Sequence, residues 1–350
     1  MQFEVTVPTF EDKVAQRAIV MVLEAIYEQD FRPCSYGFRP GRSAHQALRE
    51  LYSVITRQRQ HWVLEVDVRQ DFDSIPHSEL RAILDQRVTD GVIRRMIDKW
   101  LKAGVLEDGL LRLATEGTPQ GGVVSPALSN IYLHHVLDQW FESEVKARMS
   151  GSCTLVRFAD DFVITFKNHR DAKRVLEVLG KRFARYGLSL HPDKTRLIEF
   201  GRYAAQQRVA RGAGKPETFD FLGFTHISGK NSLGRFAVRR KTIRKRMRAK
   251  LRRIKPELRK RMHDPLAQTG QWLKSIVQGY FNYYAVPGNT PSLSLFRHRL
   301  LVLWWHSVRR RSQKHRISWT RMLDLAKRWL PAPYVLHPYP DARFAATHPR

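Results

Sequence analysis

Cysteines and acidic side chains are both scarce in this sequence, and each shortage excludes a class of protein. Among 350 residues there are two cysteines, Cys34 and Cys153, which are too few for a disulfide framework or a cysteine-based zinc site. The 33 Asp and Glu residues face 61 Lys and Arg residues, which leaves a formal net charge of +28. A surface this basic attracts polyanions, so the expected partner is nucleic acid; the alternative is an alkaline but otherwise ordinary solvated surface.

Long apolar runs are missing as well. The first residues, MQFEVTVPTFEDK, have neither the basic nor the apolar segment of a signal peptide. The longest strongly apolar run near the C-terminus, LLVLWW at residues 300–305, is far shorter than the roughly 20 residues that cross a bilayer. With 43% hydrophobic residues the chain can still build a core, so we expect a globular, cytoplasmic protein without a membrane segment.

The middle of the chain alternates between strand-like and helix-like patterns. Short apolar runs predict two single strands and a hairpin, and apolar residues at helical spacing predict helices between them. In chain order, the clearest of these elements lie at residues 62–68, 125–140, 155–166, 169–186 and 195–200. A helix follows the first strand, so the order is β, α, β, β, α, β. This is the ferredoxin-like arrangement, in which the first and third strands lie side by side.

Two adjacent carboxylates, Asp160 and Asp161, interrupt the apolar run LVRFADDFVITF at the tip of the predicted hairpin. Two like charges about 4 Å apart repel by roughly 4 kcal/mol at an effective dielectric constant near 20, so a counter-charge is needed. The ferredoxin-like order brings Asp67, at the end of the first strand, to the same place. The alternative for the pair alone is a solvated turn, and Asp71 and Asp73 are expected to be peripheral.

A cluster of three carboxylates without His or Cys suits a hard cation such as Mg2+. Two such ions about 3.5–4 Å apart can activate an attacking hydroxyl and stabilise a leaving oxygen in phosphoryl transfer. The sequence therefore predicts a metal-dependent phosphoryl-transfer site.

The last third of the chain is basic. Fifteen Lys and Arg residues and a single acidic residue, Glu257, lie between Arg235 and Arg261, in a pattern compatible with a helix. We expect a domain boundary near residues 225–235 and a helical region that continues to about residue 330.

Five blocks stand in the order of the palm motifs A to E of reverse transcriptases. They are residues 67–77 (DVRQDFDSIPH), 117–133 (GTPQGGVVSPALSNIYL), 157–164 (RFADDFVI), 187–195 (GLSLHPDKT) and 219–224 (FDFLGF). They most closely resemble the bacterial group II intron-encoded reverse transcriptase/maturases. The segments SIVQGYFNYYAVPGN and RWLPAPYVLHPYPDARF look like the maturase part of that family, so the resemblance covers nearly the whole chain.

This resemblance implies an α+β protein, a right-hand polymerase with a ferredoxin-like palm. It implies partial helical fingers over residues 1–60, the palm over residues 61–228 and an all-α thumb and maturase region over residues 229–350. The implied function is an RNA-directed DNA polymerase of a group II intron that also acts as a maturase in splicing and retrohoming. The implied partners are the intron RNA, an RNA template with a DNA primer, deoxynucleotides and a DNA target.

The resemblance also assigns catalytic roles. Asp67 and Asp160 would hold two Mg2+ ions, or Mn2+ in their place, with the Val68 carbonyl as a further ligand and Asp161 completing the acidic pair. Lys194 matches the lysine proposed to protonate the pyrophosphate leaving group; its alternative is a surface ion pair with its neighbour Asp193.

Further residues match substrate and RNA contacts in that family. Phe72 matches the steric gate against a ribose 2'-hydroxyl, or else is an ordinary core residue. Gln120 and Gly121 match the loop along the incoming nucleotide, where Gly allows close backbone approach, or else form a plain turn. Arg39 and Arg42 would contact phosphate, or else are solvated charges. The expected RNA-binding residues are Arg240, Lys241, Arg244, Lys245, Arg248, Arg252 and Tyr283, although most aromatic residues near Tyr283 are also expected in the core.

Two other functions compete with this interpretation. Members of the family normally carry a basic strand upstream of the segment that begins here at Val7, so we expect an N-terminally shortened chain. Such a chain could be an RNA-binding maturase or a degenerate fragment without polymerase activity. Another palm-fold phosphotransferase, such as a nucleotide cyclase, is the third candidate, and the block at residues 117–133 and the basic helices argue against it.

Overall fold

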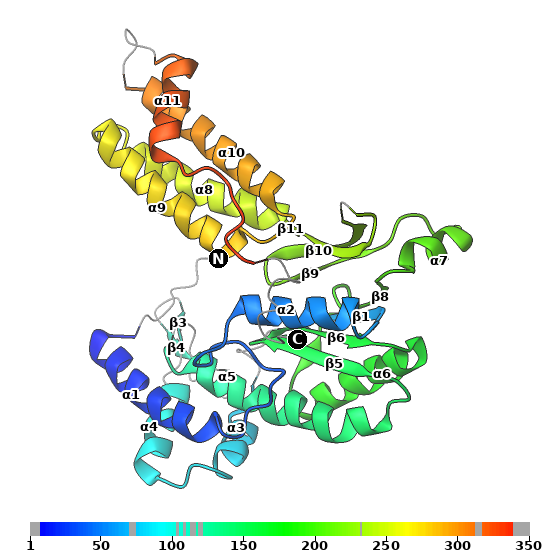
Figure 1. Ribbon diagram of the computed structural model, residues 1–350. Coiled ribbons are helices and arrows are strands. Elements are labelled where there is room, and N and C mark those ends of the chain that lie inside the picture. Colours follow the sequence, from blue (N-terminus) through cyan, green and yellow to red (C-terminus); the bar gives the residue numbers. More distant parts are fainter. Residues whose placement is uncertain are drawn as a thin grey trace, which may run out of the picture. The chain divides into compact units, whose positions relative to one another are not determined.

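The computed structural model describes residues 8–69, 75–102, 105–107, 110–112, 117, 122–231, 233–311 and 317–338. The chain divides into two compact units, Met1–Glu217 and Thr218–Arg350 (Figure 1). The finer division into fingers, palm and thumb stays a prediction. Within the described ranges, no helix is both long enough and apolar enough to cross a membrane.

A four-stranded antiparallel sheet forms the centre of the first unit. Its strands lie in the order β5-β6-β1-β8, and they are β1 (Trp62–Val66), β5 (Cys153–Phe158), β6 (Asp161–Phe166) and β8 (Arg196–Glu199). The first and third strands of the predicted series, β1 and β6, are neighbours. The ferredoxin-like arrangement expected from the sequence is therefore confirmed.

Helices cover both faces of this sheet, which explains why its strands are apolar on both sides. Helix α2 lies over one face, against β5, and α6 packs on the other face against β1 and β6 (Figure 1). The helices of this unit are α1 (Phe10–Tyr27), α2 (Ala44–Thr56), α3 (His77–Leu84), α4 (Gly91–Lys102), α5 (Ser125–Leu133), α6 (His169–Arg185) and α7 (Ala204–Ala210).

Two short strand pairs complete the described part of the first unit. They are β2 (Val68–Arg69) with β7 (Ser189–Leu190), and β3 (Val105–Glu107) with β4 (Leu110–Arg112). After α5 the chain continues through wider, π-helical turns at His134–Gln139 and Phe141–Val145 and a short 3-10 turn at Lys146–Arg148. The single helix predicted at residues 125–140 is thus α-helical only over its first nine residues.

A fully buried ion pair joins the β5–β6 hairpin to the π-helical turn. The Arg157 Nε and Nη2 atoms donate to the two carboxylate oxygens of Asp138 at 2.7 and 2.5 Å. The remaining hydrogen bonds go to the Asn130 Oδ1 and the Ala159 carbonyl, both at 2.9 Å, and to the Ser35 Oγ at 2.8 Å. Burial lowers the pKa of Arg157, but the charge and hydrogen bonds of Asp138 outweigh burial and raise it, so the side chain stays charged.

The segment before α2 packs against the same hairpin. The Arg157 N–H donates to the Cys34 carbonyl at 2.9 Å, and the Tyr36 N–H donates to the Arg157 carbonyl at 2.8 Å. A Cβ atom at Gly37 would lie 2.3 Å from the Ala159 nitrogen, so no larger residue fits there without moving the backbone. This contact fixes the turn of the hairpin from outside the sheet.

The second unit combines a three-stranded sheet with four described helices. Its strands, in the order β11-β10-β9, are β9 (Thr218–Phe221), β10 (Phe224–Lys230) and β11 (Phe236–Thr242). Its helices are α8 (Arg244–Lys260), α9 (Leu266–Tyr284), α10 (Thr290–Arg309) and α11 (Trp319–Trp329), which share one apolar core.

The all-helical prediction after residue 235 is wrong over β11. Val238, Arg240 and Thr242 are buried there, whereas Arg239 and Lys241 are exposed. This period of two, with pairing along all of β10, favours a strand although the lysines and arginines also suit a helix.

We predict that Arg157→Met destabilises the first unit by about 3–5 kcal/mol, because it leaves the Asp138 carboxylate buried without a partner. The measurement is urea unfolding of the full chain. The matched control is Arg196→Met, which removes an ion pair to Glu65 from a half-exposed arginine on the same sheet and should cost about 0–1 kcal/mol. Equal small losses from both variants would contradict the role of the buried pair.

Candidate active site

Strand register places the predicted carboxylates at one end of the central sheet. Val66, the last residue of β1, lies opposite Phe162 in β6, so the chain leaves β1 at Asp67 beside the start of β6. Phe158 pairs with Asp161 across the hairpin, which leaves Ala159 and Asp160 as its turn. Asp67 and the Asp160–Asp161 pair therefore lie at the same end of two neighbouring strands.

The turn that carries Asp160 is held in an unfavourable conformation. Ala159 has φ +57°, in the left-handed region, which costs a residue with a Cβ atom about 1–2 kcal/mol. The hydrogen bond from Arg157 to the Ala159 carbonyl and the backbone contact with Gly37 both act on this residue. The buried network around Arg157 thus fixes the backbone next to Asp160.

Lys194 contacts the first of the predicted carboxylates. Its Nζ lies 2.8 Å from the Asp67 Oδ2, and both side chains are partly exposed. The backbone holds the two segments together, since the His191 N–H donates to the Asp67 carbonyl at 2.8 Å and β2 pairs with β7. The sequence left open a pairing with Asp193, but the ion pair that Lys194 forms is with Asp67.

The predicted carboxylates suit a hard cation in their chemistry and in their place on the sheet, but their side chains are not close enough together to bind one ion. Asp67, Asp160 and Asp161 supply only oxygen atoms, are all partly exposed, and lie at one end of adjacent strands. Val68 is buried in β2. Among the residues that the structure describes, no three Asp, Glu, His or Cys side chains are close enough together to hold a metal ion. Lys194 is the cation beside Asp67 here.

A pocket of about 430 Å³ lies beside the hairpin. Phe158 and Phe38 line it with their ring centroids 6.3 Å apart. The charged side chains of Arg17, Glu24, Arg39 and Arg42 and the start of α5 line it as well. Phe38 is 58% exposed and has φ +51°, so an aromatic ring is presented to solvent by a strained backbone. The sequence pattern did not single out Phe38; its signal was an aromatic residue among the Gly, Arg and Pro residues of a loop.

The two arginines predicted to contact phosphate differ in their surroundings. Arg39 is buried and donates to both carboxylate oxygens of Glu28 at 2.9 Å and to two backbone carbonyls, those of Arg32 and Ser35. These bonds fasten the loop to the end of α1, which gives Arg39 a structural role; Arg39 also lines the pocket, and its contact with phosphate stays a prediction. Arg42 is exposed, with its guanidinium 5.6 Å from the Tyr36 ring, and remains a candidate.

Three predicted substrate residues, Phe72, Gln120 and Gly121, lie outside the described residues. Their roles stay predictions.

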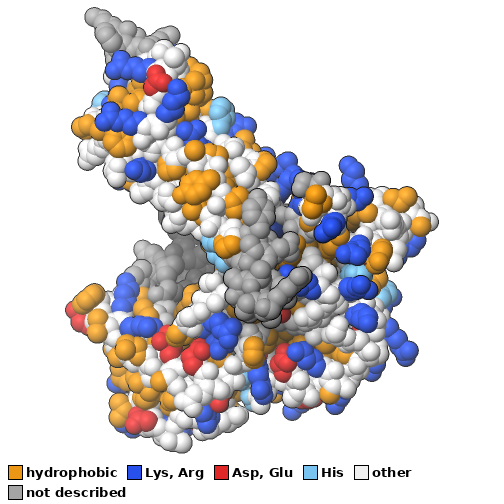
Figure 2. Space-filling model, viewed as in Figure 1, with side chains coloured by type: hydrophobic (Ala, Val, Ile, Leu, Met, Phe, Trp, Pro, Cys, Tyr) orange, Lys and Arg blue, Asp and Glu red, His pale blue; other side chains and the backbone are white. Residues whose placement is uncertain are grey.

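The predicted RNA-binding residues of the second unit are mostly at the surface, and Lys and Arg side chains are spread over both units (Figure 2). The exposed ones are Lys241, Arg244, Lys245, Arg248 and Arg252. Arg240 is a correction: it is buried, because its β11 side chain faces the sheet side occupied by His226. Tyr283 is half-buried; its hydroxyl donates to the Leu222 carbonyl at 2.9 Å and its ring stacks on Phe224, so it fastens α9 to the sheet.

Comparison with known proteins agrees with the motif blocks. The family model for "Reverse transcriptase (RNA-dependent DNA polymerase)" matches residues 2–226. Protein YkfC of Escherichia coli is 35% identical over 223 residues, which cover 55% of this chain and 58% of that protein. The group II intron-encoded protein LtrA of Lactococcus lactis is 33% identical over 208 residues, which cover 57% of this chain and 34% of that protein. The chain thus spans between a third and three fifths of these relatives.

Among solved structures, telomerase from Candida tropicalis aligns over 95% of this chain and 53% of its own, with 12% identity and a TM-score of 0.47. The α+β polymerase class and the resemblance to group II intron-encoded reverse transcriptases, both predicted from the sequence, are confirmed by the family match and the named relatives. Because the family model matches more than half of its length, the chain belongs to the reverse transcriptase (RNA-dependent DNA polymerase) family.

Proposed function

We propose that this chain is the RNA-directed DNA polymerase of a group II intron and that it also serves as the maturase of that intron. The observation that carries the proposal is that Asp67 and the Asp160–Asp161 hairpin lie at the same end of neighbouring strands, in a chain of the reverse transcriptase family. Its substrates would be deoxynucleotides and an RNA template with a DNA primer. Intron RNA and a DNA target would be its further partners, in the cytoplasm.

Asp67, Asp160 and Asp161, with the Val68 carbonyl, are the residues that would hold two Mg2+ ions, or Mn2+ in their place. Bound there, such ions supply the charge that activates a primer hydroxyl and stabilises the leaving oxygen. The protein's own contribution is placement: the Arg157 network fixes the turn at Asp160, and the β2–β7 pairing fixes the backbone after Asp67.

Lys194 would act as a proton donor. Its ammonium is held at the site by Asp67, at 2.8 Å, and it would give a proton to the pyrophosphate oxygen as that group leaves. Arg42 would contact phosphate, and the pocket lined by Phe158 and Phe38 offers apolar surface for a base or a sugar. Phe72, Gln120 and Gly121 keep their proposed contacts with the incoming nucleotide.

The second candidate function is an RNA-binding maturase without polymerisation. It is favoured by the basic surface of the second unit, because cations exposed on α8 can bind RNA whether or not the first unit is active.

The proposed regions are fingers over residues 1–60, palm over 61–228 and thumb with maturase region over 229–350.

We predict that Asp160→Asn lowers primer extension on an RNA template with Mg2+ by about a thousandfold or more, or roughly 4 kcal/mol of activation free energy. Asp193→Asn removes an exposed carboxylate next to Lys194 and serves as the control, with extension close to that of the wild type. Equal extension by both variants would contradict the proposed site. No extension by the wild type, with tight RNA binding retained, would favour the maturase without polymerase activity.

We also predict that affinity for intron RNA falls steeply between about 50 and 200 mM salt, because phosphate contacts release counterions. Replacing Arg244, Arg248 and Arg252 by Gln should reduce the slope of log affinity against log salt by about 2 to 3. The control replaces three exposed cations of α6, Arg170, Lys173 and Arg174, by Gln and removes the same charge from the first unit. Fluorescence anisotropy of labelled RNA gives both slopes. Equal losses would show that overall charge, and not α8, holds the RNA.

A further inference from the structure

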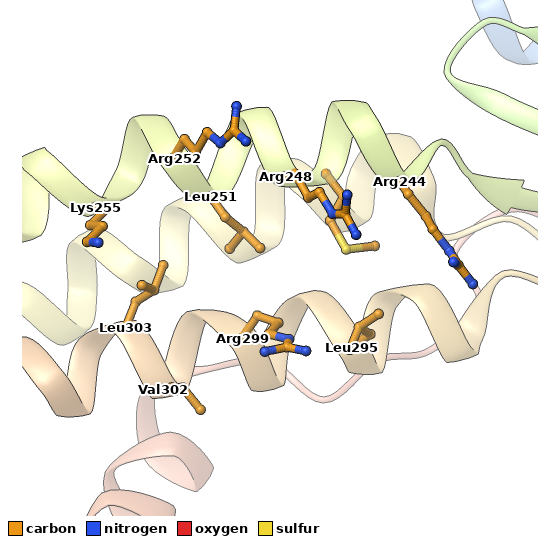
Figure 3. Close-up of a pocket in the computed structure, with 10 residues that line it drawn as sticks. Arg244, Arg248, Leu251, Arg252, Lys255, Leu295, Arg299, Val302 and Leu303 are labelled. Carbon is orange, nitrogen blue, oxygen red and sulfur yellow. The ribbon is translucent and has the colours of Figure 1, made fainter.

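A groove of about 550 Å³ runs between α8 and α10 of the second unit (Figure 3). Its floor is apolar and comes from both helices. Its rim is entirely cationic, with four residues from α8 and Arg299 from α10. The floor residues are Met247, Leu251, Leu295, Val302 and Leu303, and the α8 rim residues are Arg244, Arg248, Arg252 and Lys255.

Part of the floor is open to solvent, although Met247 belongs to the core of this unit and Leu251 and Leu303 pack against it. Leu295 is 45% exposed, and Leu251, Val302 and Leu303 are half-buried. An exposed apolar strip framed by polar side chains commonly marks a binding surface.

The positive charges of the rim are not neutralised by acidic side chains within the described residues. Arg244, Arg248 and Arg252 follow one another at every fourth residue on one helix face, where like charges repel by a few tenths of a kcal/mol per pair. Within the described residues, no ion pair engages any of the five rim cations, whereas Lys260 and Arg261 at the end of the same helix both pair with Glu257. The rim therefore retains its charge for an external anion.

The chemistry of the groove selects a ligand that is anionic along its backbone and apolar on its faces. Four of the five rim cations are Arg, whose planar group binds phosphate with two hydrogen bonds and stacks on bases. Successive rim arginines on α8 rise by about 6 Å, comparable with the separation of neighbouring phosphates in an extended strand. In a duplex the base faces are stacked inside the helix, so only a single strand can place them on the floor.

We propose that this groove binds single-stranded RNA, with phosphates on the arginine rim and base faces on Leu251, Leu295 and Val302. This inference rests on the proposed RNA binding by the second unit and deepens it. It adds Arg299 and an apolar floor to the exposed cations of α8. An acidic amphipathic peptide would also match the charge of the rim, and the experiment separates the two.

The test uses the full chain and a labelled, unstructured RNA of about 12 nucleotides, with a blunt duplex of the same length as the second probe. The floor variant Leu295→Ser with Val302→Ser changes no charge. We expect it to bind the single strand about five- to tenfold more weakly, with the same salt slope and unchanged duplex binding. Arg299→Gln should instead reduce the salt slope for the single strand by about 0.7. Leu323→Ser, at a leucine of α11 that is 40% exposed, is the control and should bind both probes like the wild type.

Wild-type binding of the single strand by the floor variant, or equal losses for single strand and duplex, would overturn the proposal. If the floor variant loses binding of an acidic amphipathic peptide but not of RNA, the groove docks a protein, and the proposal is overturned as well. Primer extension on the same preparations separates this failure from that of the proposed polymerase. If the wild type does not extend a primer but still loses single-strand binding in the floor variant, the proposed polymerase is rejected and the proposed groove is supported. If the wild type extends a primer and the floor variant binds RNA normally, the polymerase is supported and the groove is rejected.

Discussion

The buried ion pair between Arg157 and Asp138 is the interaction on which the arrangement of the first unit depends. Removing two charges from water costs several kcal/mol for each ion, and only excellent geometry with further hydrogen bonds offsets that cost. Arg157 has both: two bonds to Asp138 and three more to Asn130, Ala159 and Ser35. These partners come from the π-helical turn after α5, from α5, from the hairpin turn and from the segment before α2. One side chain thus aligns four parts of the chain around Asp160.

The two units differ in where they carry their charged side chains. The first unit carries half-exposed carboxylates on a backbone that buried contacts hold rigidly, which is what a site for phosphoryl transfer requires. The second unit carries its cations on exposed helix faces around an apolar floor, which suits a long, flexible polyanion better than a small substrate. The chemistry proposed for the first unit needs precise geometry, whereas the RNA binding proposed for the second needs charge density and accessible apolar surface.

Much of this could be predicted from the sequence, because apolar periodicity specifies strands and helices and the ferredoxin-like order then brings Asp67 to the hairpin. The sequence is least informative where burial decides the surroundings of a charged side chain. Arg39 and Arg240 look like surface cations in the sequence, yet each is enclosed by its own loop or sheet. In the sequence, Arg157 stands out only as part of a motif. Its position inside an apolar strand, with Asp138 in a helical segment 19 residues earlier, is the signal of a buried pair.

The central claim is that this buried pair holds Asp160 beside Asp67 in a site for divalent metal ions. The most direct test is a titration of the full chain with Mn2+. The electron paramagnetic resonance signal of the free ion measures how much Mn2+ stays unbound. The wild type should bind about two ions per chain, as a two-metal site requires. Asp67→Asn should lose this binding, and Arg157→Lys, which keeps the charge but not the forked hydrogen bonds, should weaken it. Undiminished Mn2+ binding by both variants would contradict the account.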